Sequence, residues 1–314
     1  MAVSVDYFVI LAFVGLMVTS GTFWIGAARG LLPWMARRPE EPAPTVKPWS
    51  LVDLALLLVF LTGALAVAQA WALRGVELDA NQPLQLAKLD PVVRVRMVWS
   101  SNVGVCTGML LGLAWLRVRH RLRLRDILGD GRFWRLDLAR GVTMFLLVAP
   151  PALALQMLLT RFFPSTHPLI EIVTKNPEPR FLWASGVSAV IIAPVVEELQ
   201  FRALLQGWLQ TAACKSIPAE RWLFGSSPAT SISESQTLAP PVPPAVWPVV
   251  FSALLFAAVH WNHGPDPIPL FVFALGLGWL YRRTGRAYAG MVVHFLLNLW
   301  TLLLLLLKIY GGDS

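Results

Sequence analysis

Charged residues and cysteines are scarce in this sequence. Asp, Glu, Lys and Arg make up 14% of its 314 residues, against about 25% in ordinary soluble domains. A water-soluble protein of this length needs a far more polar surface, so the composition excludes a soluble globular fold. The two cysteines, Cys106 and Cys214, lie far apart and lack metal-binding spacing. This excludes a disulfide framework and predicts that both are packing residues.

The positive net charge does not indicate a nucleic-acid partner. The formal charge is +8, but the basic residues stand between apolar runs and form no patch on a polar domain. That distribution is typical of membrane topology, so the expected partners include membrane lipids and no nucleic acid. The first apolar run, residues 3–28, is too long for a signal peptide and lacks a basic start. We expect it to remain as a spanning helix.

Long apolar runs are abundant. Hydrophobic residues make up 56% of the chain, the mean hydropathy is +0.61, and one span needs about 20 apolar residues. The sequence therefore predicts an all-α fold, a polytopic membrane helix bundle of about eight transmembrane helices. The sixth and seventh runs are short and separated by WNHGPDP, so they form either two short spans or one re-entrant pair. The eight runs lie near 5–28, 51–73, 98–116, 140–160, 181–213, 246–261, 267–282 and 287–308.

Basic residues concentrate in alternate connections between these runs, which places the N-terminus outside. The composition, rich in Arg, Trp and Ala, favours a multi-pass protein of a bacterial inner (plasma) membrane. We divide the chain into an N-terminal four-helix membrane region (1–160) of unknown role, a membrane core (180–310) and a mobile Ser/Pro-rich loop (225–244). The first region has ionisable groups only near the ends of its apolar runs, among them Asp6 and Asp53, so chemistry is expected in the core.

The segment PVVEELQFR (194–202) places charges inside an apolar run, where each costs about 2.5–3.5 kcal/mol at the bilayer centre. On a helix Glu198 and Arg202 are four residues apart and share a face, so they can pair and offset this cost. Glu197 is rotated to another face and cannot share the arginine equally. A buried carboxyl without a cation has a raised pKa, which suits a general base near neutral pH.

Two more polar sets occur in apolar runs. FAAVH places Phe256 and His260 four residues apart, and HFLLN does the same for His294 and Asn298. Each pair shares one helix face. Polar groups in spans usually face the bundle interior and mark function, and the depths of these groups along their helices agree with Glu197. The three segments can therefore converge on one pocket.

The motifs EExxxR, FxxxH and HxxxN, in this order, resemble those of the CPBP family, the CAAX-processing and bacteriocin-processing intramembrane endopeptidases, also called Abi. The segment GWLYRRTGRAYAGMVVHFLLNLW is similar to the family's last motif, and the resemblance covers residues 180–308. The long Ser/Pro segment between the first two motifs departs from the family pattern. The N-terminal region resembles no family that we can name.

This resemblance implies a glutamate-dependent intramembrane endopeptidase that needs no metal or cofactor. In that family's mechanism, Glu197 would activate a water molecule with the help of His260. His294 and Asn298 would stabilise the oxyanion of the tetrahedral intermediate. Structural support would come from Glu198, Arg202 and Phe256. The implied substrate is a peptide or protein with a membrane-proximal C-terminal segment, lipidated where the cleavage is of the CAAX type.

Other classes fit the residues less well. The nearest alternative is a zinc-dependent, metalloprotease-like enzyme, but this sequence lacks the motif HExxH. A serine intramembrane protease would need a nucleophile motif, and ASGVS (184–188) is not one. A proton-coupled transporter would show inverted repeats, and none is seen. A non-catalytic scaffold or bacteriocin-immunity protein on the same fold stays open. The remaining histidines, His120, His167 and His263, are expected to have no catalytic role, the first two in loops.

Overall fold

A computed structural model describes residues 5–76, 86–163, 173, 178–225, 245–261 and 264–311. Within these residues every regular element is a helix, which confirms the all-α class. The predicted mobile loop at 225–244 lies, apart from Gly225, outside the described residues, and so do His167 and His263.

Among the described residues six helices are long and apolar enough to cross a membrane, so the predicted count of eight is not confirmed. The other two apolar runs form the shorter helices α11 (Trp247–Ala258) and α12 (Pro267–Thr284), of 12 and 18 residues. At 1.5 Å per residue α11 rises only about 18 Å, well short of a bilayer core of about 30 Å. The six are α1 (Val5–Ala28), α2 (Leu51–Ala72), α3 (Pro91–His120), α5 (Trp134–Phe162), the long helix Pro179–Ala212 and α13 (Tyr288–Tyr310).

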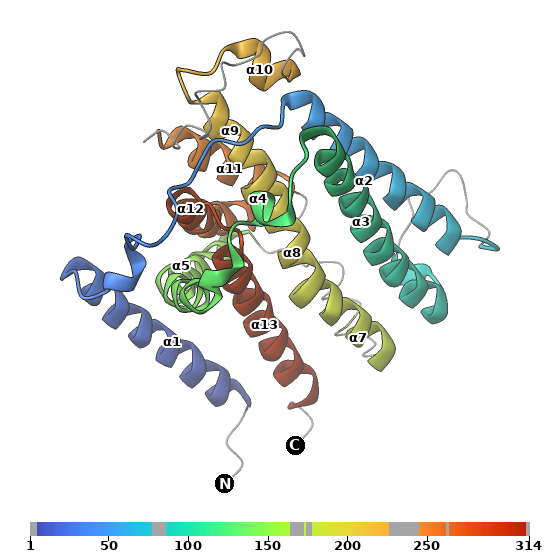
Figure 1. The fold of residues 1–314 in the computed structure, drawn as a ribbon. Helices are drawn as coiled ribbons and strands as arrows, with labels where there is room; N and C mark the ends of the chain where they lie inside the picture. Colours follow the sequence, from blue (N-terminus) through green and yellow to red (C-terminus); the bar gives the residue numbers. More distant parts are fainter. Residues whose placement is uncertain are drawn as a thin grey trace.

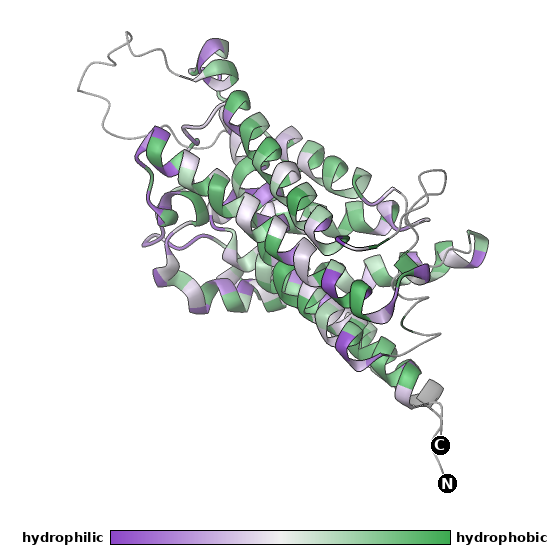
Figure 2. Cartoon of the chain, turned by 90° about the vertical axis from the view of Figure 1, so that its right-hand side faces the viewer, coloured by the Kyte–Doolittle hydropathy of each residue, from purple (hydrophilic) through white to green (hydrophobic). Residues whose placement is uncertain are grey.

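The basic connections meet at one end of the bundle, together with the short elements η1 (Pro33–Met35), α4 (Leu124–Leu128), η3 (Gly131–Phe133) and α10 (Ala219–Phe224). Lys47 Nζ donates to the Asp126 carbonyl at 2.7 Å, and Ala287 N donates to the Leu128 carbonyl at 2.9 Å. Figure 1 shows α10 at this end, and the first turn of α1 and the last turn of α13 at the other. Figure 2 shows hydrophobic residues along the helices and hydrophilic ones gathered towards their ends.

The α2–α3 pair lies side by side in Figure 1 and depends on three glycines spaced four residues apart on α3. A Cβ at Gly108 would lie 2.6 Å from Leu61 Cα and 2.7 Å from the Phe60 carbonyl oxygen. Gly104 and Gly112 face α2 at similarly close range. Small residues at this spacing let two membrane helices approach to backbone contact.

The same pair is joined at its basic end by Asp53. This buried carboxylate completes a capping box with Ser50 and accepts from Trp115 Nε1 at 3.0 Å. Arg119 and His120 also reach it, at 3.1 and 3.0 Å. His120 was expected in a loop; it is the last residue of α3, because the helix continues past its apolar run to reach this carboxylate.

The apolar cores join the two halves of the chain. One cluster brings Leu16 of α1 and Met144 of α5 together with Leu277 of α12 and Val293 of α13. Gly141 of α5 allows close contact with α13, since a Cβ there would lie 2.6 Å from the Val292 side chain. The helices that carry the predicted site are therefore packed directly against the N-terminal region.

The long helix Pro179–Ala212 is not a regular α-helix throughout. It consists of α7 (Pro179–Val187), the π-helical η4 (Ser188–Ile192), α8 (Ala193–Glu197), the π-helical η5 (Glu198–Gln206) and α9 (Gly207–Ala212). Pro194 has no N–H to donate and its ring crowds the preceding turn, which explains the widened stretch before it. π-helical stretches of this kind are frequent at functional sites.

Helices α11 and α12 form an antiparallel pair against this long helix. Val249, near the start of α11, contacts Gly278, near the end of α12, while Phe256 clusters with Leu270 at the opposite ends. The connection between them, which carries His260, therefore lies at the far end of the pair from the basic loops.

Candidate active site

The two adjacent glutamates lie about midway along the long helix, where α8 meets η5. Successive helical residues point about 100° apart, so their carboxylates face different surroundings. The side chain of Glu197 is 26% exposed, whereas that of Glu198 is 0% exposed. Glu197 is therefore the more accessible of the two carboxylates.

Glu198 forms the ion pair that its spacing predicts. Its Oε2 lies 3.3 Å from Arg202 Nε, and both side chains are fully buried. Arg202 Nη1 also donates to Ser252 Oγ at 3.2 Å, and that hydroxyl donates to the Phe201 carbonyl at 2.8 Å. The pair neutralises two buried charges and ties α11 to the long helix.

His294 of α13 lies between the two glutamates. Its Nδ1 is 3.7 Å from Glu198 Oε1 and its Nε2 is 3.9 Å from Glu197 Oε2. Both distances exceed a hydrogen bond, but a water molecule or a small movement can close them. Gly290, one turn earlier on α13, makes this approach possible, because a Cβ at that position would overlap Glu198 Oε2.

Phe256 is the apolar centre of the site. Its ring lies edge-on to Phe201 at 5.2 Å and to His294 at 5.9 Å between centroids. The same ring is 5.1 Å from His260 and 5.2 Å from the Arg202 guanidinium carbon. The two imidazoles are thus held around one buried ring, and Phe273 of α12 contacts His294 from another direction.

His260 follows the end of α11 and is half-buried. Its Nδ1 lies 2.8 Å from the Phe256 carbonyl oxygen. A carbonyl can only accept, so Nδ1 carries a proton and donates to it. This hydrogen bond fixes the orientation of the His260 ring beside Phe256.

Asn298 lies one turn beyond His294 on α13. Its Nδ2 donates to the Ala189 carbonyl at 2.7 Å, in the widened stretch η4. One N–H of the amide therefore ties α13 to the long helix. A primary amide has a second N–H, and this second N–H would have to make the predicted contact with the oxyanion. That contact stays a prediction.

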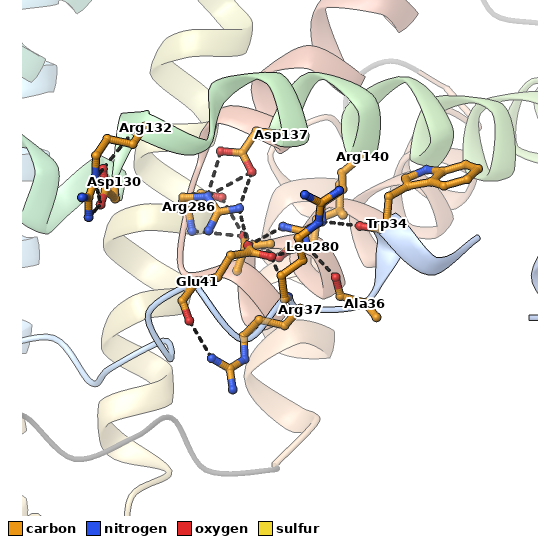
Figure 3. A network of polar contacts seen from close by, with 12 residues as sticks. Trp34, Ala36, Arg37, Glu41, Asp130, Arg132, Asp137, Arg140, Leu280 and Arg286 are labelled. Atoms are coloured by element: carbon orange, nitrogen blue, oxygen red, sulfur yellow. Dashed lines mark hydrogen bonds and ion pairs between the residues drawn. The ribbon is translucent and has the colours of Figure 1, made fainter. Parts of the chain in front are cut away.

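A buried network of charged groups fixes the start of α13. Figure 3 shows Glu41 between Arg140 and Arg286. Arg140 contacts both Glu41 oxygens at 2.6 Å, and Arg286 Nη2 contacts Glu41 Oε2 and Asp137 Oδ1, each at 2.7 Å. Two guanidinium groups thus neutralise two carboxylates, at the turn two residues before α13 begins.

The electrostatics of this network favour the ionised acid. Burial alone would raise the pKa of the Glu41 carboxyl, but hydrogen bonds from Arg140, from the Arg38 amide and from Arg286 lower it from 4.5 to about 2. Burial opposes the charge of Arg286 as well, but hydrogen bonds to Asp137 raise the pKa of its guanidinium. Glu41 and Arg286 therefore remain charged at neutral pH.

The donor set of the site is two carboxylates and two imidazoles. Across the described part of the chain, no three His, Cys, Asp or Glu side chains gather as a group that could hold a metal ion. The arrangement can accept a proton at Glu197 or His260 and can present the imidazole of His294 to a developing charge.

Residues 179–300 match the family model described as type II CAAX prenyl endopeptidase Rce1-like. This part of the chain is therefore similar to the Rce1-like family. The match begins at the first residue of the long helix and ends within α13. This stretch, the Rce1-like segment, includes Glu197, Glu198, Arg202, Phe256, His260, His294 and Asn298, but not Glu41, Asp137 and Arg140 of the charged network. The match also indicates a protease of the CAAX type. No curated protein and no solved structure matches the chain.

The geometry of the Rce1-like segment adds residues that sequence reasoning missed. Ser252, Phe273 and Gly290 contact the paired charges or His294, and no local pattern distinguishes them from packing residues. Gln206 could have been identified from the sequence, because it continues the four-residue spacing of Glu198 and Arg202.

Proposed function

We propose that this protein is an intramembrane endopeptidase in which Glu197 activates water for attack on a peptide bond. The observation that carries the proposal is the partly exposed Glu197, with its Oε2 3.9 Å from His294 Nε2, within a helix long and apolar enough to span a membrane. The Rce1-like match supports a CAAX-type protease. We further propose the CPBP glutamic type and a bacterial inner membrane.

In the proposed reaction Glu197 takes a proton from a water molecule, and the water oxygen attacks the carbonyl carbon of the peptide bond. His260, held beside Phe256, would assist this proton transfer. Glu197 then passes the proton to the departing amine. General-base help of this kind contributes about 10²–10⁴ in rate.

Charge develops on the former carbonyl oxygen. His294 Nε2 and the second N–H of Asn298 would donate to it, and one such donor is worth about 10²–10³ in rate. Glu198, 3.7 Å from His294 Nδ1, would hold that imidazole in the orientation that directs Nε2 towards Glu197. The proposed substrate is a peptide or protein with a membrane-proximal C-terminal segment, lipidated in the CAAX case.

The test is Glu197→Gln in the full chain, reconstituted with a prenylated peptide that ends in a CAAX sequence and with the same peptide unprenylated. We expect cleavage to fall about 10²–10⁴-fold while the variant purifies like the wild type. The matched control is Glu220→Gln, an exposed glutamate on α10 that should cleave normally. Activity should survive a metal chelator, which separates this mechanism from a zinc protease.

Cleavage by Glu197→Gln at the wild-type rate would contradict the proposed role of this residue. A wild-type chain that binds both peptides and cleaves neither would favour the non-catalytic scaffold.

A further inference from the structure

A polar cavity of about 620 Å³, called here the basic cavity, lies at the basic end of the bundle. Its volume is within the range of about 300–1,000 Å³ that is typical of ligand sites. Its walls come from the segment 42–48, the connection between α3 and α5, the helix α10 and the turn between α12 and α13. Among the described residues, the charged side chains of its lining are Lys47, Arg125, Arg132, Arg221 and Arg286, with Asp126 and Asp130.

Two of the five basic side chains are neutralised within the protein. Arg132 Nη2 lies 2.7 Å from Asp130 Oδ2, and Arg286 pairs with Glu41 and Asp137 (Figure 3). These two arginines therefore need no further anion, and they contribute little to the net charge of the basic cavity.

The other three cations outnumber the acid that remains beside them. Lys47, Arg125 on α4 and Arg221 on α10 share the lining with Asp126, whose Oδ1 is 4.0 Å from Arg125 Nε. Burial lowers the pKa of the Lys47 amine to about 8, although the charge of Asp126 opposes this shift. An anion in the basic cavity would favour the charged amine and offset the surplus of positive charge.

The walls of the basic cavity are fixed to one another. The Thr211 hydroxyl accepts from Lys47 N at 2.8 Å and donates to the Lys47 carbonyl at 3.0 Å. Gly129 has a φ of +99°, and a Cβ at this position would overlap the Arg286 side chain, so glycine lets two walls meet. A ligand that enters a cavity with fixed walls loses little affinity to the ordering of the protein.

The basic cavity lies at the level where spanning helices end. Pro48, Arg132 and Arg286 of its lining stand two or three residues before α2, α5 and α13, and these helices are long and apolar enough to cross a membrane. Trp134, the first residue of α5, is 56% exposed, as is usual for tryptophan at the level of the lipid headgroups. Basic pockets between membrane helices on the cytoplasmic side bind the headgroups of anionic lipids.

We propose that the basic cavity binds a phosphate group, carried by the headgroup of an anionic phospholipid. Arginine and lysine are the usual partners of phosphate, through charge-assisted hydrogen bonds, and here they come from three separate elements. The phospholipid is the favoured source, because lipid phosphates are the anions found where membrane helices end; free phosphate is the other source. The described lining includes neither Glu197 nor a histidine, so this binding site is separate from the proposed active site and does not depend on the proposed function.

The test is isothermal titration calorimetry of the full chain in neutral detergent micelles. The three probes are dihexanoyl phosphatidylglycerol, dihexanoyl phosphatidylcholine and inorganic phosphate. We expect phosphatidylglycerol to bind, and phosphatidylcholine, whose choline cancels the phosphate charge, to bind at least about fivefold more weakly. Arg125→Met and Arg221→Met should each weaken the binding of phosphatidylglycerol about fivefold. The matched control is Arg29→Met, which removes an exposed arginine at the same end of the bundle but outside the described lining, and it should bind like the wild type.

The comparison of probes identifies the source of the phosphate. If inorganic phosphate binds as tightly as phosphatidylglycerol, and Arg125→Met and Arg221→Met weaken both, the phosphate site stands with free phosphate as its ligand. The proposal is overturned if neither anionic probe binds, or if Arg29→Met weakens binding as much as the two cavity variants do. Wild-type affinity in both cavity variants would overturn it as well.

Discussion

Removal of Arg202 should be among the most damaging single changes in this protein. Arg202 and Glu198 are both fully buried with Nε and Oε2 3.3 Å apart, so Arg202→Met leaves an uncompensated carboxylate in the bundle. Breaking a buried ion pair in this way costs about 3–5 kcal/mol, whereas replacing both partners by neutral groups is often nearly neutral. The double variant Glu198→Gln/Arg202→Met should therefore be more stable than Arg202→Met alone.

The assay is the apparent free energy of unfolding of the purified variants in mixed micelles, from detergent titration. We expect a coupling energy of about 2–3 kcal/mol between the two positions. The control Arg125→Met removes an arginine whose side chain is 64% exposed, and it should change the free energy by less than about 0.5 kcal/mol. A double variant no more stable than Arg202→Met would refute the reasoning, since the cost would then lie in lost packing and not in an unpaired charge.

Two further predictions concern the scaffold. Gly108→Ala should destabilise the fold by about 1–3 kcal/mol, because the added Cβ meets the α2 backbone, whereas Gly63→Ala meets nothing within 4 Å and should not; equal unfolding curves for the two variants would contradict this. Glu41→Gln should lower stability at pH 7 by up to roughly 3 kcal/mol, since the pKa of Glu41 falls from 4.5 to about 2 on folding. An acid whose pKa is lower in the folded state stabilises the fold at pH values above its unfolded-state pKa. The difference in free energy of unfolding between wild type and Glu41→Gln should therefore shrink as the pH falls from 4.5 towards 2. A difference that stays constant over this range would contradict the prediction.

The helical class and the site helices were accessible from sequence, because both follow from local patterns. Apolar runs marked every long helix, and the four-residue spacing of Glu198 with Arg202 fixed their pairing on one face. The number of spans was not accessible, because α11 and α12 are apolar enough to resemble spans but too short or too charged at their ends to qualify. Whether a helix spans the membrane depends on its length relative to the bilayer thickness. The boundaries of an apolar run in the sequence do not fix that length.

Other features depend on contacts that no local pattern encodes. Glu41 and Arg286 are 245 residues apart in the chain and 2.7 Å apart in space. The space that Gly290 leaves for Glu198 also arises only when α13 packs on the long helix. The glycines of α3 were readable, since their regular spacing is the usual sign of close helix packing in membranes.

The buried charge network at the start of α13 joins residues inside the stretch that matches the family model to residues outside it. Arg286 lies inside the Rce1-like stretch, but the carboxylates that neutralise it, Glu41 and Asp137, come from outside that stretch. A shortened chain that began at residue 179 would keep the guanidinium and lose both anions. The border at which the family match begins is therefore a poor place to cut this polypeptide, because the cut would remove both carboxylates that neutralise Arg286.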